Sequence, residues 1–183
     1  YHLVLHADVD ENQTLSDDDV CLRWCQLYRA PLLVDRWMKQ QLKTQSEKDV
    51  ALQIINCWRE RLVDISWFMR CLNEFIARKA NKEDKCKGRF WEGRFKSQAL
   101  LDEKALLTCM AYVDLNPIRA AIARTPEQSD YTSVQERIKH PDSDCLVPFS
   151  EQDSGTLPFR LKDYLELVDW GGREVKRNKR GYI

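Results

Sequence analysis

The sequence of 183 residues contains no apolar run that approaches the length of a membrane-spanning helix, and no signal peptide is visible at its start. It also lacks a C-x-x-C pair among its seven cysteines. Cys21 and Cys25 are four residues apart, but no Cys or His pair follows them at the spacing of a zinc finger. These absences argue against a membrane partner and a zinc finger, and they predict reduced thiols in a cytoplasmic protein.

Net charge is absent as well, because 29 Lys and Arg balance 29 Asp and Glu. The positive charge is nevertheless gathered in two places. Residues 78–96 hold eight basic against three acidic side chains, and residues 173–183 hold five against one. Because a local field acts within a Debye length, such clusters attract phosphate even in a neutral protein. A solvated surface with chance clustering is the alternative.

The apolar fraction of 43% is enough for the core of one domain, or of one domain with a small appendage. Three helices are predicted within residues 16–62, because Ser16 is a good N-cap and Pro31 separates the first helix from the second. Their aromatic residues recur at helical spacing, which indicates a core rather than a ligand site. A fourth predicted helix, at 65–80, has a continuous apolar face that would cover a sheet.

The last third of the sequence predicts two more helices and a linker. A short helix should follow the capping residues 130–133 and end at about Ile138. Residues 140–158 hold three of the six prolines and have the composition of a linker. An amphipathic helix at 160–170 should then end at Gly171-Gly172, before a basic tail.

Two stretches have the composition of strands. Residues 1–7 alternate as a strand does, and without an initiator Met we expect further residues to precede them. In residues 90–100, aromatic and apolar residues are interleaved with Arg94, Lys96 and Gln98, which is typical of a strand with a basic face.

The helix after the second strand carries the candidate chemistry. Asp102 is its predicted N-cap. Pro117 should end it and make Asn116 the cap of a short second helix. Tyr112 and Asn116 are four residues apart on one face, so a phenol nucleophile and a metal-holding amide oxygen would be neighbours. The alternative is a packed tyrosine beside a capping asparagine.

Three segments together resemble a known family. YVDLNPIRA, at residues 112–120, fits the pattern Y-[IV]-x-x-N-P-[VI]-R-A. WEGRF, at 91–95, fits W-x-x-R-[FY], and HLV, at 2–4, fits the end of N-H-x-H-L-V. In these segments the chain resembles the single-tyrosine transposases of the HUH superfamily, which include the REP-associated tyrosine transposases.

This resemblance implies an α+β fold. We expect a ferredoxin-like HUH domain at residues 1–139, with a helical insertion at about 16–62. Its antiparallel sheet would be incomplete, because the first strand would precede Tyr1. Residues 140–158 would be a linker, and residues 159–183 a C-terminal helix with a basic tail.

The resemblance also implies a DNA transposase that cleaves and rejoins single-stranded or hairpin DNA through a 5′-phosphotyrosine intermediate. Tyr112 would be the nucleophile. His2 and Asn116 would bind one divalent metal, Mg²⁺ or Mn²⁺, together with a second histidine two residues before His2. Because that histidine would lie upstream of Tyr1, we expect this chain to be a truncated and inactive form.

Phe90, Trp91 or Phe95 could stack on an unpaired base, with burial as the alternative for Trp91. A homodimer is left open, as are two other functions: a non-catalytic DNA-binding module derived from such an enzyme, and an HUH nicking endonuclease of the replication or conjugation type. The residues expected to contact DNA phosphates are Arg94, Lys96, Arg119, Arg89 and Lys87.

Overall fold

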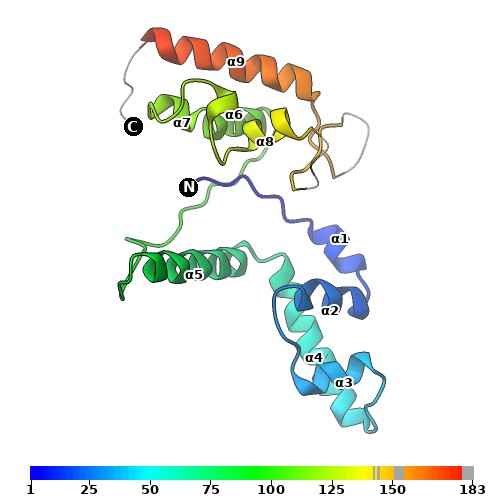
Figure 1. The fold of residues 1–183 in the computed structure, drawn as a ribbon. Helices are drawn as coiled ribbons and strands as arrows, with labels where there is room; N and C mark the ends of the chain where they lie inside the picture. Colours follow the sequence, from blue (N-terminus) through cyan, green and yellow to red (C-terminus); the bar gives the residue numbers. More distant parts are fainter. Residues whose placement is uncertain (142, 144, 151–154, 179–183) are drawn as a thin grey trace. The chain divides into compact units, whose positions relative to one another are not determined.

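The computed structural model in Figure 1 describes residues 1–141, 143, 145–150 and 155–178, the last five of these by their backbone alone. The chain divides into two compact units. The first, called here the tyrosine unit, consists of Tyr1–Val4 and Gln98–Ile183. The second, the tryptophan unit, consists of Leu5–Ser97.

The tryptophan unit is helical from its first element to its last (Figure 1). Ser16 and Asp19 cap α2 reciprocally, and Thr44 and Glu47 do the same for α4. Side-chain oxygens thereby satisfy backbone N–H groups that a helix start leaves without partners. The three helices predicted between residues 16 and 62 are confirmed as α2, α3 and α4. The five helices are α1 (Val9–Thr14), α2 (Asp17–Cys25), α3 (Leu32–Met38), α4 (Gln45–Leu62) and α5 (Ile65–Glu83).

An aromatic stack forms the core of the tryptophan unit, where α2 and α3 pack on α4. The rings of Trp24 and Trp58 are nearly parallel, with centroids 5.2 Å apart, and Val20, Val34 and Ile55 around them are fully buried. The expectation that these aromatic residues form a core is therefore confirmed. Burial of side chains of this size supplies about 1.5–3 kcal/mol each.

The tyrosine unit contains four α-helices among the residues described: α6 (Glu103–Asp114), α7 (Asn116–Arg119), α8 (Ser133–Lys139) and α9 (Leu161–Asn178). A 3₁₀ turn, η1, occupies Pro126–Gln128. α9 packs along α6 and α7 (Figure 1). The core consists of Met110, Leu115, Ile118, Val134, Tyr164 and Val168.

The glycines of α9 correct a prediction. The sequence predicts that the last helix ends at Gly171-Gly172, but α9 continues through both of them to Asn178. A Cβ on Gly171 would lie 3.1 Å from Leu115 Cδ1, and one on Gly172 would lie 3.3 Å from Leu115 Cδ2. These glycines therefore allow a close approach of α9 to Leu115 and do not end the helix.

The predicted α+β, ferredoxin-like domain with an antiparallel sheet is wrong. The described residues contain helices and no strand, and their only β pairing is an isolated bridge between Phe149 and Leu157. Residues 1–7 and 90–100, both predicted as strands, have no regular secondary structure. Alternation alone does not make a strand, because its backbone groups need a neighbouring strand as hydrogen-bond partner.

The prediction of a helix at 65–80 that covers a sheet is confirmed in part by α5. It forms where the sequence predicts it, but there is no sheet for its apolar face to cover in the part of the chain that is described. Phe75 on that face remains 66% exposed and Phe68 45% exposed.

Two features of the structure bear on absences noted in the sequence. None of the seven cysteines is joined to another in a disulfide. Within the described ranges, none of the helices has both the length and the apolarity needed to cross a bilayer.

Candidate functional site

Tyr112 lies on the last turn of α6, and the start of that helix is built as the sequence predicts. Asp102 is the N-cap, and its carboxylate accepts a hydrogen bond of 2.6 Å from the backbone N–H of Ala105. Glu103 occupies the first turn, where the helix dipole favours a negative charge. The register of α6, and hence the position of Tyr112, is set by this cap.

A buried carboxylate fixes the corner at which α6 meets α7. Asp114 is 1% exposed. It accepts hydrogen bonds from Ser133 Oγ at 2.6 Å and from the backbone N–H of Val134 at 3.2 Å. Its other oxygen accepts a bond of 2.5 Å from Tyr164 Oη. One side chain therefore connects the end of α6 to both α8 and α9.

The surroundings of Asp114 change the ionisation of its neighbours. Burial raises the pKa of Tyr164 far above its usual value, and the adjacent Asp114 carboxylate adds to the effect. Burial lowers the pKa of Arg137, an effect that Tyr164 and Asp114 partly oppose. The Arg137 guanidinium carbon also lies 4.5 Å from the centroid of the Phe149 ring. Asp114 is thus at the centre of a polar cluster inside an otherwise apolar core.

Sequence reasoning missed the structural role of Asp114. The available signal was a carboxylate between Val113 and Leu115, in a turn whose neighbours are apolar. A charged group at such a position is costly to bury unless it is hydrogen-bonded, which predicts partners from elsewhere in the chain.

Tyr112 itself is half-buried, and the Arg119 guanidinium carbon lies 4.5 Å from the centroid of its ring. Arg119 is exposed, and no carboxylate of a described residue forms a salt bridge with it. The predicted nucleophile and one of the predicted phosphate-contact residues are therefore in contact, a pairing that the sequence did not predict. Cation–π contacts of this kind contribute about 0.5–1 kcal/mol at exposed sites.

Asn116 does not have the capping role predicted for it. It is the first residue of α7, and Leu115, which has no side chain able to cap, holds the N-cap position. The Asn116 carbonyl accepts a hydrogen bond of 2.9 Å from the backbone N–H of Ala120. Its side chain is half-buried, and its amide makes no hydrogen bond to a described residue.

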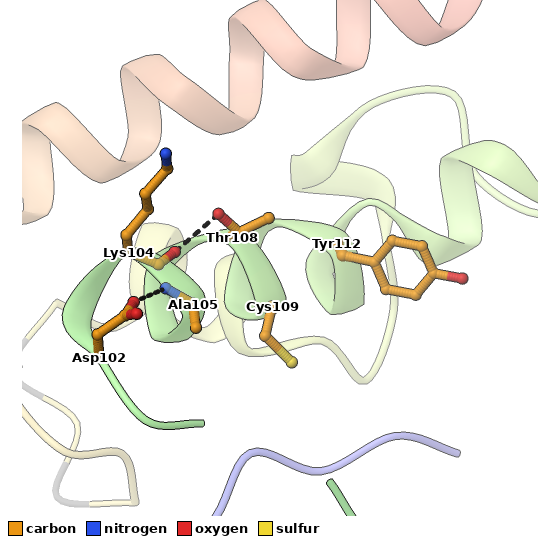
Figure 2. Close-up of a pocket in the computed structure, with 6 residues that line it drawn as sticks. All are labelled: Asp102, Lys104, Ala105, Thr108, Cys109 and Tyr112. Carbon is orange, nitrogen blue, oxygen red and sulfur yellow. Dashed lines mark hydrogen bonds between the residues drawn. The ribbon is translucent and has the colours of Figure 1, made fainter. Parts of the chain in front are cut away.

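A shallow hollow of about 470 Å³ runs along α6 beside Tyr112. Thr108 Oγ1 donates a hydrogen bond of 2.7 Å to Lys104. The acceptor is the backbone carbonyl, and the side-chain ammonium of Lys104 is not involved. Figure 2 shows the Tyr112 hydroxyl pointing away from Cys109. The hollow is lined by Asp102, Lys104, Ala105, Thr108, Cys109 and Tyr112.

The predicted metal ligands do not form a metal site by themselves. His2 is exposed in an irregular segment whose Val4 packs on the core of the tyrosine unit. Among the described residues, no hydrogen bond joins His2 to Tyr112 or Asn116, and no three His, Cys, Asp or Glu side chains are grouped as metal ligands. One imidazole and one amide oxygen are too few for Mg²⁺, which requires near-octahedral oxygen ligands.

The other residues predicted to contact DNA lie in the tryptophan unit, in the segment that follows α5. Trp91 is half-buried, and its indole N–H donates a hydrogen bond of 2.9 Å to the carbonyl of Asn73 on α5. Phe90 packs edge-on against Trp91 with centroids 4.8 Å apart. This anchor agrees with the alternative in which Trp91 packs against the protein. The segment's residues that were predicted to contact phosphates, all exposed, are Lys87, Arg89, Arg94 and Lys96.

Comparison with known proteins adds no relative to this picture. No protein-family model matches the chain. No curated protein matches it, and no solved structure matches it either. Arguments about function therefore depend on the corner between α6 and α7 and on the segment 112–120.

Proposed function

We propose that this chain is a tyrosine transposase that acts on single-stranded DNA, with Tyr112 as its nucleophile. The observation that carries the proposal is the contact between the Arg119 guanidinium and the Tyr112 ring, 4.5 Å apart at an accessible corner. A nucleophile for a phosphodiester needs a nearby cation, because negative charge develops on the phosphate oxygens during attack. Arg119 supplies that cation next to the phenol.

The reaction conserves the energy of the bond that it breaks. The Tyr112 hydroxyl oxygen attacks phosphorus, the bond from phosphorus to the 3′ oxygen breaks, and the phenolic proton passes through solvent to that oxygen. The products are a 5′-phosphotyrosine and a free 3′-hydroxyl. Attack by another 3′-hydroxyl on the phosphotyrosine reforms a phosphodiester and restores the tyrosine.

The surroundings of Tyr112 support three requirements of this reaction: a positioned nucleophile, a surface for the strand and a cation for the phosphate. Three hydrogen bonds to Asp114 hold the corner rigid, and positioning of the nucleophile is a large part of such catalysis. The hollow along α6 provides a surface for the strand beside the phosphate, with Lys104 among its lining residues. Arg119 can bind a phosphate oxygen through its N–H groups while its face contacts the ring.

A second candidate is a DNA-binding module without cleavage. The observation that favours it is the absence, among the described residues, of a cluster of three metal-ligand side chains. In this case the exposed Arg94 and Lys96 would still bind phosphates. Tyr112 would serve as a packing and stacking residue.

Trapping a covalent adduct separates these candidates. The chain is incubated with Mg²⁺ or Mn²⁺ and a 3′-labelled pool of random-sequence single strands and hairpins, and adducts are resolved by denaturing electrophoresis. Because one imidazole and one amide oxygen are too few ligands for the metal, the proteins tested carry one added histidine before Tyr1, two residues from His2. We expect labelled protein from this extended chain and from its Tyr131→Phe variant, a control at a fully exposed tyrosine of the same unit, but none from its Tyr112→Phe variant. DNA binding without any adduct would support the second candidate, and equal adduct from Tyr112→Phe would contradict the proposed nucleophile.

A further inference from the structure

A second cationic site lies in the tryptophan unit, where two arginines meet one tryptophan. We propose that Arg61 and Arg70, held against Trp67, bind a backbone phosphate of a nucleic-acid strand. This binding site goes beyond the proposed reaction, because it involves neither Tyr112 nor its corner. All three residues belong to one compact unit, at the junction of α4 and α5.

The guanidinium groups of both arginines lie close to the same ring, that of Trp67. The Arg61 guanidinium carbon lies 4.0 Å from the centroid of Trp67, and that of Arg70 lies 5.1 Å from it. Trp67 in turn stacks on Trp24, with centroids 6.1 Å apart and an angle of 26° between the rings. Because Trp24 is buried in the core, the platform beneath the two arginines is anchored.

The indole N–H of Trp67 is buried and has no hydrogen-bond acceptor among the described residues. Packing and the two guanidinium groups, rather than a hydrogen bond, therefore keep the ring in place.

The charges of Arg61 and Arg70 are not neutralised within the described part of the chain. Neither forms a salt bridge there, whereas Arg59 pairs with Asp17 at 2.7 Å and donates two further hydrogen bonds to backbone carbonyls. Arg59 is thus a structural arginine, and its neighbour Arg61 two residues later is not. A guanidinium stacked on a ring still presents its planar edge of N–H donors, which matches the oxygens of a phosphate.

One basic segment of the same unit favours a nucleic acid as the source of the phosphate. Residues 78–96, in the same unit, hold eight basic against three acidic side chains. A polyanionic strand can contact this segment and the arginine pair, and each phosphate neutralised adds counterion release to the affinity. An acidic peptide also carries negative charge, and its carboxylates fit a guanidinium fork as well, so competition between the two ligands has to separate them.

Binding of a labelled 20-nucleotide single strand by anisotropy, measured across salt concentrations, tests this site. We expect Arg61→Gln with Arg70→Gln to weaken binding about tenfold at low salt, and to make the salt dependence of log Kd shallower by about 0.7 for each phosphate that the protein no longer neutralises. The matched control is Arg29→Gln with Arg36→Gln, which removes two exposed charges of the same unit and should change affinity less than about twofold. Equal decreases in affinity for the two double variants would overturn the proposal.

A conservative variant separates the guanidinium fork from the charge. Arg61→Lys with Arg70→Lys keeps both charges, so circular dichroism should match the native chain and the salt dependence should be retained, with an affinity about threefold lower. Unchanged affinity in this variant would contradict recognition by the fork. Competition by an acidic peptide that matches that of an unlabelled strand would overturn the assignment to nucleic acid, whereas weaker competition by inorganic phosphate is expected. Adduct formation at saturating DNA should persist in both arginine variants, so failure of this site is distinguishable from failure of Tyr112.

Discussion

The two units of this protein are stabilised by different kinds of interaction. In the tryptophan unit, stacked rings of Trp24 and Trp58 fill the core among fully buried aliphatic residues. In the tyrosine unit, the carboxylate of Asp114 lies inside the core and accepts three hydrogen bonds. Apolar burial is non-directional, whereas a buried carboxylate is stabilising only when its donors keep their geometry.

This difference matches what each unit presents on its surface. Under the proposed function, the tyrosine unit would need one precise corner, because Tyr112 and Arg119 would act only in a fixed relation to each other. The proposed phosphate site of the tryptophan unit would need a stable platform for cationic side chains such as Arg61. A directional core suits the first requirement, and a stacked apolar core suits the second.

Truncation of the stacked core should have the largest effect. Trp58→Ala removes the partner of Trp24 from a site that is 4% exposed, and we expect a loss of about 3–5 kcal/mol in the free energy of unfolding. Urea unfolding followed by near-ultraviolet circular dichroism measures it. Leu27→Ala, at a side chain that is 80% exposed, should change stability by less than about 0.5 kcal/mol. A loss for Trp58→Ala as small as that of the control would show that the stack is not the core of this unit.

Replacement of the buried carboxylate should come next. Asp114→Asn keeps the shape but exchanges one acceptor oxygen for an NH₂ group that faces donors, so we expect a loss of about 2–3 kcal/mol. Amide hydrogen exchange should show faster opening of α6 and α9 and unchanged protection of α4. Equal protection of α6 in the two proteins would contradict the role given to Asp114.

Alkaline pH should destabilise the tyrosine unit more than the tryptophan unit, and this difference should be smaller than the effects of the two substitutions above. The folded tyrosine unit keeps the Tyr164 phenol protonated, because burial raises its pKa, while the unfolded chain releases that proton above about pH 10. The unfolded state then binds fewer protons, so stability should fall as pH rises from about 10, by about 1.4 kcal/mol per pH unit.

The control for this pH dependence is Tyr164→Phe. This variant should be less stable at neutral pH, but the protection of α6 and α9 should fall less steeply with rising pH than in the native chain. In the tryptophan unit, a hydrogen bond to Cys71 and partial burial raise the pKa of Tyr28 to about 12. Because Tyr28 is only half-buried, its contribution should be smaller. A steeper alkaline loss of protection in α4 than in α9 would contradict this assignment.

Local signals in the sequence were sufficient for most of the helices. Ser16, Asp102 and Thr132 all cap the helices that the sequence predicts, because an N-cap depends on residues within one turn of it. These inferences require no knowledge of distant parts of the chain. The contact of Arg119 with Tyr112 was not predicted, although both residues lie in one short segment.

Long-range partners were not predictable in the same way. The alternating residues 1–7 and 90–100 satisfy the sequence pattern of strands, but no neighbour pairs with them in the described structure. The partners of Asp114 lie 19 to 50 residues away, so nothing near it in the sequence identifies them. The role of the two glycines of α9 was not predictable for the same reason, because it depends on Leu115, which is distant in the sequence.

The smallest expected effect concerns the approach of α9 to Leu115. Gly172→Ala raises helix propensity by about 1 kcal/mol, but the new Cβ would lie 3.3 Å from Leu115 Cδ2, tight enough for Leu115 to have to shift. Leu115 is buried and contacts both glycines, so we expect the two effects nearly to cancel, with a net change below about 0.5 kcal/mol. In a Leu115→Ala background the obstacle is gone, and Gly172→Ala should stabilise by about 1 kcal/mol. A double-mutant cycle of unfolding free energies measures the coupling, and strictly additive changes would show that α9 does not need its glycines to approach the corner that holds Tyr112.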